Sequence, residues 1–435
     1  MKIKKSDVLD CIIIYWMIAY VFIISWLAYI TQASLIMICL ITVRLFLDLK
    51  RTLRLPALYF GLFFSLVYPV WSYISVGGSQ ALLASNMITI ITTTTLFVYM
   101  SFVCKYKRNF ITRFFKKKKY VFNIYMVINI PVLVLQLGGH TELSGKHPES
   151  LTNAFSADLV SGLFGYNGTG LLTMYFCFLM LYNFVQYKCK YIKKKRIFVL
   201  YNFLLFVFIS FVASNSDNKA LFVLVPLFLI SYLIVFRMNL YKNTLQRMKV
   251  LLRYIFKGIC VFTLFVVGLQ PVIGTLDLIR DIVDKLQEGL TNANVAYGSA
   301  ERLGTIVFAL NNPDIRWKGA GIARHAWQES YGLGFAHFGI SDFGSFLCLG
   351  GIVFVLSLIC FLLAVYRTVF RDKIAGYTFF TLTVIVLIYT QLMTVMSLTC
   401  SWIFLVFATV LGCESIKNEQ KRRTIKSTIY RHKKR

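Results

Sequence analysis

Twelve apolar runs, most of them close to the length of a membrane-spanning helix, constrain this chain more than any other feature. At about 1.5 Å per residue, a helix of about 20 residues crosses a hydrocarbon core of about 30 Å. The sequence therefore predicts an all-α, polytopic integral membrane protein with about 12 transmembrane helices. The runs lie at residues 10–29, 33–47, 55–75, 81–104, 120–138, 169–186, 197–213, 220–236, 258–275, 341–366, 377–395 and 398–414.

The composition indicates that lipid, rather than water, is the solvent of this chain. Of its 435 residues, 58% are hydrophobic and 15% are charged, whereas soluble proteins carry about 25% charged residues. The run at 33–47 is the weakest predicted span, because it is short and contains Arg44. We expect the Arg44 side chain to snorkel to the headgroup region, as basic side chains near the ends of spans do. The spans are otherwise nearly free of charge.

The basic residues predict how the chain is oriented. The net charge is +29, and 38 of the 47 Lys and Arg residues fall on one side of the membrane when the predicted spans alternate. The basic loops at 105–119 and 188–196 lie on that side, and 12 of the 18 acidic residues lie on the other. Because positively charged loops stay in the cytoplasm, we expect both termini there, in the bacterial inner (cytoplasmic) membrane. The charge then reflects topology and attraction to anionic headgroups, so no nucleic-acid partner is expected.

One predicted loop is far longer than the others. Its apolar residues recur at helical spacing over 276–290, which predicts a helix along the membrane interface. A second short helix is expected over 303–310, followed by a tight turn over 317–321. The chain divides into spans one to nine with short loops (1–275), the large periplasmic loop (276–340), spans ten to twelve (341–414) and a basic cytoplasmic tail (415–435).

Neither a cofactor nor a metal is expected. The cytoplasmic loops contain no GxxxxGK[ST] or GxGxxG motif, and none of the ten cysteines has the spacing of a zinc site. Function is therefore expected inside the membrane or at its external face, above all in the large loop, because loops of this length usually carry function.

Positive charge on the external side is scarce, so each instance is informative. Cations held at an interface suit an anionic, phosphorylated ligand, and Arg can grip a phosphate through two parallel hydrogen bonds. Alternatively, these cations pair with nearby acidic residues such as Glu301 and Asp314 on a solvated face. The five that carry the hypothesis are Lys219, Arg302, Arg316, Lys318 and Arg324.

His337 lies among glycines just before the tenth predicted span. It is a candidate base or hydrogen-bonding group, with a purely structural histidine as the alternative. Trp317 and Tyr331 in the same loop are candidates for stacking on sugar rings, although aromatic residues near a membrane also serve as interfacial anchors.

Three local patterns, together with the order of spans and loop, resemble the superfamily of O-antigen polymerases and O-antigen ligases. The hairpin from Ser214 to Lys219 is similar to a Ser-rich hairpin that ends in a basic residue, and Gly165 to Gly168 is similar to the family's entry to an earlier span. The third pattern is the order along the large loop: Arg302, Asn312, Pro313, Gly319, Gly321, His337, Asp342, Gly350 and Gly351.

The sequence departs from the family pattern at two positions. Lys219 stands where many members have Arg, and Phe338 follows His337, which favours polymerase over ligase.

The resemblance implies a metal-independent glycosyltransferase without a cofactor, embedded in the membrane. It would transfer a growing glycan from one undecaprenyl diphosphate carrier to a new lipid-linked repeat unit, with a polysaccharide chain-length regulator as a candidate partner. Lys219 and Arg302, with Arg316 and Arg324 in support, would hold the leaving diphosphate. His337 would act as base, with Asp342 or Glu301 in reserve. Trp317, Tyr331 and Asp342 would bind sugar.

Two alternatives remain: an O-antigen ligase, or a flippase or other transporter of lipid-linked oligosaccharides. A transporter is expected to place charged residues deep inside its spans and to show repeated, interrupted helices. The nearly charge-free spans and the lack of an internal repeat favour the polymerase.

Overall fold

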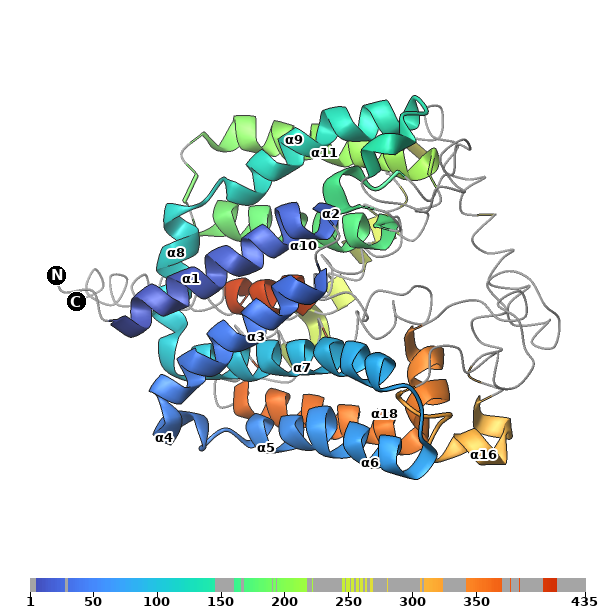
Figure 1. The fold of residues 1–435 in the computed structure, drawn as a ribbon. Coiled ribbons are helices and arrows are strands. Elements are labelled where there is room, and N and C mark those ends of the chain that lie inside the picture. The colour runs from blue at the N-terminus through green and yellow to red at the C-terminus, as the bar shows by residue number, and fades with distance from the viewer. Residues whose placement is uncertain are drawn as a thin grey trace, which may run out of the picture.

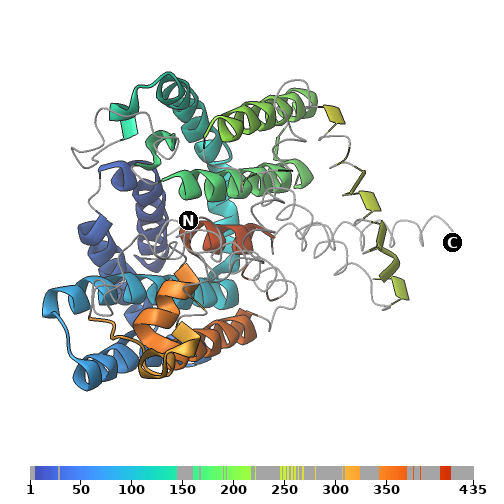
Figure 2. The same cartoon turned by 90° about the vertical axis from the view of Figure 1, so that its right-hand side faces the viewer.

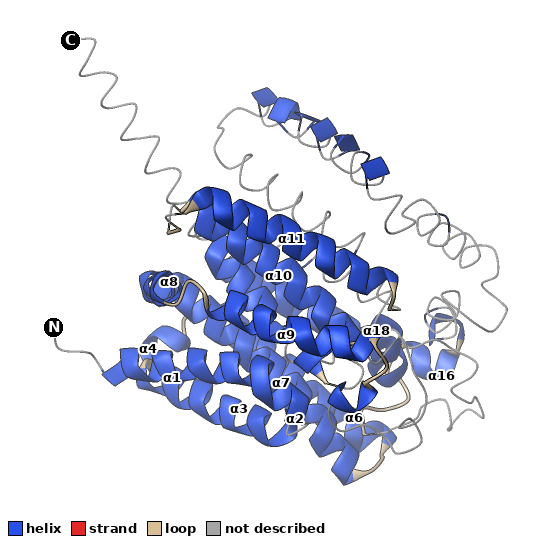
Figure 3. Ribbon diagram, turned by 90° about the horizontal axis from the view of Figure 1, so that it is seen from above, coloured by secondary structure: helices blue, strands red, loops and turns tan. Residues whose placement is uncertain are grey.

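The computed structural model describes residues 5–27, 30–144, 160–165, 168–189, 191–192, 194–216, 309–323, 342–369 and 402–412, with short pieces between 221 and 306 and single residues at 376 and 383. Every regular element among these residues is a helix (Figure 3). An all-α fold is therefore confirmed for the described part of the chain.

Seven helical stretches in the described residues are long and apolar enough to cross a membrane. Each begins within a few residues of a predicted apolar run, and the run around Arg44 is one of them. Two further apolar helices, α9 (Val121–Leu137) and Trp402–Gly412, are shorter. The seven are Asp7–Ile24, Ile30–Leu47, Pro56–Val76, Gln80–Lys107, Thr169–Lys188, Lys195–Ser214 and Phe346–Val369.

Several expectations fall on residues outside the described part. The runs at 220–236 and 377–395, most of the run at 258–275 and the interfacial helix over 276–290 belong to this group. The count of twelve spans and the extent of the large loop therefore stay predictions.

The helices carry the labels of Figure 1. Three π-helical turns interrupt the first, third and fourth spans, at Tyr20–Ile24, Phe63–Val67 and Val103–Lys107. The labelled helices are α1 (Lys5–Ala19), α2 (Ser25–Leu27), α3 (Ile30–Leu47), α4 (Leu49–Thr52), α5 (Pro56–Leu62), α6 (Tyr68–Val76), α7 (Gln80–Phe102), α8 (Arg108–Lys117), α9 (Val121–Leu137), α10 (Thr169–Lys188), α11 (Lys195–Ser214), α16 (Pro313–Arg316) and α18 (Asp342–Val369).

The helix Trp402–Gly412 lies at the centre of the bundle, although it is close to the C-terminal end of the sequence (red in Figures 1 and 2). Each of its residues is buried. Its aromatic rings pack against rings of surrounding helices: Trp402 lies 5.1 Å from Phe97 of α7, and Phe404 lies 5.5 Å from Tyr175 of α10, between ring centroids. Such ring pairs add about 0.5–1.5 kcal/mol each beyond the burial of their area.

The bundle has two distinct ends (Figure 1). At one end, Lys119 Nζ donates a hydrogen bond to the Tyr191 carbonyl at 3.2 Å, and the Tyr182 hydroxyl donates to the Lys118 carbonyl at 3.1 Å. The first contact joins the two basic loops that the sequence places on one side of the membrane, and the second joins one of these loops to α10. We call this the basic end, which also carries α4 and α8. The opposite end, with α16 and the turn between α6 and α7, is the loop end.

Arg44 does not snorkel, so that expectation is wrong. Its side chain is fully buried, with Nε 2.7 Å from Asp10 Oδ1 and Nη1 2.8 Å from Asp48 Oδ2. The physical reason is that α1 and α3 pack against each other, which brings a carboxylate of the first span beside the guanidinium of the second. The spans are therefore less free of charge than the sequence suggested.

Candidate functional site

Of the nine residues that the sequence nominates, with Glu301 only in reserve, three have side chains in the described part of the chain: Arg316, Trp317 and Lys318. Asp342 is described as the first residue of α18, without a position for its side chain. The other five lie outside the described residues, so the structure does not test whether they come together. They are Lys219, Arg302, Arg324, Tyr331 and His337.

Arg316 and Trp317 belong to a short ordered stretch at the loop end. Residues 309–311 are helical, and Asn312 then caps α16: its Oδ1 accepts a hydrogen bond from the Asp314 amide at 3.0 Å. Pro313 occupies the first helical position, where its fixed φ is favourable and its missing N–H costs nothing. Arg316 Nε donates to the Leu310 carbonyl at 2.5 Å, which leaves the end of its guanidinium available.

After α16 the chain turns within the expected stretch, where the Gly319 amide donates to the Ile315 carbonyl at 2.8 Å, and it then runs over α18 (Figure 2). The Ala320 amide donates to the Cys348 carbonyl at 2.8 Å, and the Gly321 amide donates to the Leu349 carbonyl at 3.0 Å. In return, the Trp317 carbonyl accepts from the Val353 amide at 3.2 Å. We call residues 317–323 the docked segment.

The docked segment contacts α18 at the point where that helix is interrupted. Gly351 has a φ of 66° and a ψ of −171°, which ends one helical stretch and starts the next. The interruption frees backbone groups that must be paired elsewhere in an apolar setting. The docked segment pairs three of them, and the Tyr68 hydroxyl of α6 donates to a fourth, the Gly350 carbonyl.

Two glycines allow this close approach of two backbones. A Cβ on Gly351 would overlap the backbone of Trp317, and a Cβ on Gly319 would overlap the backbone of Leu349. Gly319 also has a φ of 72°, in the left-handed region. The contact therefore requires glycine at both positions.

The other side of the docked segment is held by the third and fourth spans. Asn86 Nδ2 of α7 donates to the Ile322 carbonyl at 2.6 Å, and the Ile322 amide donates to Ser72 Oγ at 3.3 Å. The Ser79 amide donates to the Ala323 carbonyl at 3.0 Å. The docked segment is thus fixed on both sides.

The docking leaves three adjacent side chains at the exposed edge of the loop end. Trp317 is 60% exposed, Lys318 is exposed and Arg316 is half-buried. Two cations next to an exposed aromatic ring can contact an anionic or sugar-bearing ligand from outside the bundle. The nearby carboxylate, Asp314, is exposed and forms no ion pair within the described part of the chain.

A second charged cluster lies inside the spans and was missed by the sequence analysis. Asp10 Oδ1 accepts from Arg44 Nε at 2.7 Å and from the Tyr99 hydroxyl of α7 at 3.0 Å. Lys107 Nζ lies 2.5 Å from Asp7 and 3.9 Å from Asp10 Oδ2. The signal was present in the sequence: residue 10 starts one run, residue 44 lies near the end of the next, and adjacent spans run in opposite directions. The pair therefore stands at one level of the membrane.

The buried cluster joins charged side chains of the first, second and fourth spans. The Arg44 guanidinium also lies 4.8 Å from the Phe102 ring centroid of α7. Removing one partner of a buried ion pair costs about 3–5 kcal/mol, because the other charge is left uncompensated. Its position at the basic end separates it from the docked segment, so we assign it a role in holding the bundle together.

Metal ligands are not grouped in the described residues: no set of three or more His, Cys, Asp or Glu side chains there could hold an ion.

Comparison of the chain with protein-family models, with curated proteins and with solved structures found no match. Function is therefore inferred from the residues themselves.

Proposed function

We propose that this protein is a membrane-embedded polymerase of a bacterial surface glycan. It transfers a growing chain from one undecaprenyl diphosphate carrier to a new lipid-linked repeat unit at the external face of the inner membrane. The observation that carries the proposal is the docking of residues 317–323 on the interrupted α18. It holds Arg316, Trp317 and Lys318 at the end of the bundle opposite the basic loops.

The chemistry of the proposed reaction needs cations that are in place before the bond breaks. The leaving group is a lipid diphosphate, and preorganised cations stabilise its developing negative charge most strongly where water is excluded. A backbone fixed from both sides presents Lys318, with Arg316 directly before it, so that only side chains and not the loop remain to be ordered on binding. Trp317, which is exposed beside them, is placed to stack on a sugar ring.

The remaining catalytic roles stay as expected from the sequence. In the proposal, Lys219, Arg302 and Arg324 complete the diphosphate site, and His337 accepts the proton of the attacking hydroxyl. Tyr331 and Asp342 bind sugar. Both termini lie in the cytoplasm, and a chain-length regulator is a candidate partner.

Deletion of the gene tests this function. The polymerase proposal predicts single repeat units on the outer-membrane lipid core and no ladder of longer chains. A ligase would instead leave polymer on the lipid carrier, with nothing attached to the core. Normal ladders in the deletion strain would contradict both activities.

A transporter of lipid-linked oligosaccharides is the second candidate, and two observations favour it. The helix α18 is interrupted at Gly351, and the ion pair between Asp10 and Arg44 lies inside spans. Interrupted helices and intramembrane charges are typical of transporters. Purified protein in liposomes separates the two activities, because a polymerase lengthens glycans whereas a transporter moves them across the bilayer unchanged.

A further inference from the structure

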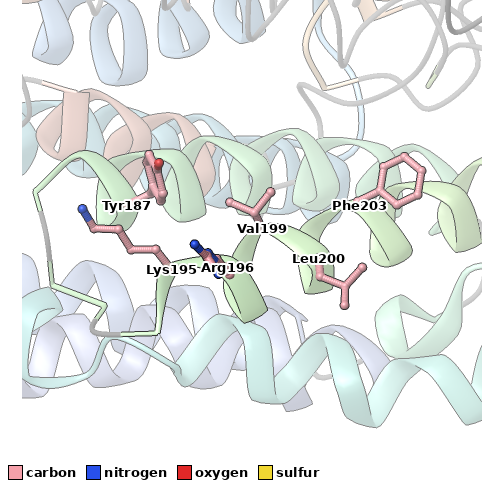
Figure 4. Close-up of a pocket in the computed structure, with 6 residues that line it drawn as sticks. All are labelled: Tyr187, Lys195, Arg196, Val199, Leu200 and Phe203. Atoms are coloured by element: carbon pink, nitrogen blue, oxygen red, sulfur yellow. The ribbon is translucent and has the colours of Figure 1, made fainter.

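A groove on the outside of the bundle combines apolar walls with two cations at one end (Figure 4). It has a volume of about 470 Å³, within the range of about 300–1,000 Å³ that ligand sites occupy. Tyr187 lines it from α10, and Val199, Leu200 and Phe203 line it from α11. Lys195 and Arg196, in the first turn of α11, complete the lining. This groove lies on a different part of the bundle from the docked segment, and it has no part in the proposed reaction.

The two cations have no carboxylate partner on the elements that form the groove. Neither α10 nor α11 contains an Asp or Glu. Within the described residues neither cation forms an ion pair, and Lys195 Nζ lies 5.6 Å from the Tyr187 ring centroid. The N-terminus of α11 adds its positive dipole end beside them. This end of the groove is therefore suited to a negative group.

The apolar part of the groove extends along the membrane-crossing direction of α11. Phe203 follows Lys195 by eight residues, which corresponds to about 12 Å along a helix. Val199, Leu200 and Phe203 are all exposed, as expected of side chains that contact lipid tails. A ligand that spans the groove has an anionic head at the basic end and an apolar tail along α11.

The walls of the groove are fixed relative to each other from the inside. Asn183 Nδ2 of α10 donates to Asn202 Oδ1 of α11 at 2.8 Å. Asn183 also exchanges hydrogen bonds of 2.8 and 2.9 Å with Asn123 of α9. Amide pairs between membrane helices contribute about 0.6–2 kcal/mol each, so a ligand meets a groove that is already formed.

We propose that this groove binds one anionic phospholipid from the leaflet at the basic end. Lys195 and Arg196 contact the headgroup phosphate, and an acyl chain lies along Val199, Leu200 and Phe203. The negative headgroup distinguishes this lipid from the zwitterionic ones around the protein. The inference does not depend on the proposed polymerase activity, because it concerns binding at a separate place.

Native mass spectrometry of the full-length protein in a neutral detergent tests the proposal. Phosphatidylglycerol is titrated into delipidated protein, with phosphatidylcholine of the same acyl chains as the reference. One phosphatidylglycerol is expected to bind ahead of any phosphatidylcholine. The double variant Lys195→Gln/Arg196→Gln is expected to bind phosphatidylglycerol about thirtyfold more weakly, since each basic group near a membrane surface contributes about fivefold.

The matched control is Lys50→Gln/Arg54→Gln. It removes one Lys and one Arg, both exposed, from the same end of the bundle, and it is expected to bind phosphatidylglycerol like the native protein. Leu200→Trp, which fills the apolar part of the groove, is expected to weaken the binding of both lipids.

Four results would overturn the proposal. The first is an equal loss of phosphatidylglycerol binding in the two double variants, and the second is undiminished phosphatidylglycerol binding in Lys195→Gln/Arg196→Gln. The third is displacement of the lipid by inorganic phosphate at the same concentration. The fourth is a Leu200→Trp variant whose only effect is to convert a dimer of the protein into a monomer. The first two would indicate attraction by bulk charge. The third would indicate an ion site, and the fourth a contact between two copies of the chain.

Discussion

The carbonyl of Trp317 accepts a hydrogen bond from the amide of Val353 at 3.2 Å, across the interruption of α18. These residues are 36 positions apart in the sequence, and the contact ties a segment of the predicted large loop to a helix that is long and apolar enough to cross a membrane. It places the side chains of Arg316, Trp317 and Lys318 at a fixed edge of the bundle. The proposed diphosphate site depends on this placement.

The glycine at position 319 is expected to be required for docking. In Gly319→Ala, the new Cβ would overlap the Leu349 backbone, and the left-handed backbone adds strain of about 1–2 kcal/mol. We expect the docked segment to separate from α18 and glycan ladders to disappear, while the protein still accumulates in the membrane. Immunoblots and ladder profiles measure both.

Gly77→Ala is the matched control for this substitution. Gly77 has a φ of 77°, close to the 72° of Gly319, but a Cβ there would meet no atom within 4 Å. The control therefore also places an alanine at a positive φ, but without the overlap, and it should keep its ladders. Equal loss in both variants would assign the defect to strain alone.

The hydroxyl of Tyr68 is expected to stabilise the interrupted helix. In Tyr68→Phe, the buried Gly350 carbonyl loses its donor, which costs about 1–3 kcal/mol. Tyr59→Phe is the control, because the Tyr59 hydroxyl donates to the Leu53 carbonyl at an exposed position. Thermal unfolding in detergent should show a lower midpoint for Tyr68→Phe than for Tyr59→Phe. Identical midpoints would argue against a stabilising role of this hydrogen bond.

The buried ion pair gives a third prediction. Arg44→Met leaves Asp10 inside the bundle without its guanidinium partner, so the free energy of unfolding should fall by about 3–5 kcal/mol. The double variant Asp10→Asn/Arg44→Met should recover part of that loss, because no uncompensated charge remains between them. Denaturation of the purified variants measures this. A loss below about 1 kcal/mol, as expected of an exposed cation, would contradict the burial of the pair.

The orientation of the bundle gives a fourth prediction. Reporter enzymes that work only after export should be inactive when fused near residues 112, 192 and 245, and active near residues 145, 216 and 300. The reason is the concentration of basic residues on one side of the predicted spans. Export activity at residue 112 would reverse the layout and, with it, the external position of the proposed site.

The sequence predicted the seven apolar helices that the described residues contain, because hydropathy over about 20 residues is a local property. It predicted the turn over 317–321 but not the partner of this segment, since backbone pairing with residues 348–353 depends on tertiary packing. It misjudged Arg44 for the same reason: a single span cannot reveal that Asp10 of its neighbour supplies the counter-charge. The order of residues in the large loop supports a hypothesis about Arg302 and His337, which lie outside the described residues.

Polymerisation by the purified protein tests the central claim most directly. The protein is reconstituted into liposomes with undecaprenyl diphosphate-linked repeat units, and the glycan length is followed by gel electrophoresis and mass spectrometry. We expect the native protein to lengthen the glycan. Arg302→Ala should lower the rate about a hundred- to a thousandfold, as the loss of one charge-stabilising donor does in other enzymes. Movement of intact repeat units across the bilayer without any lengthening would contradict the account and favour the transporter.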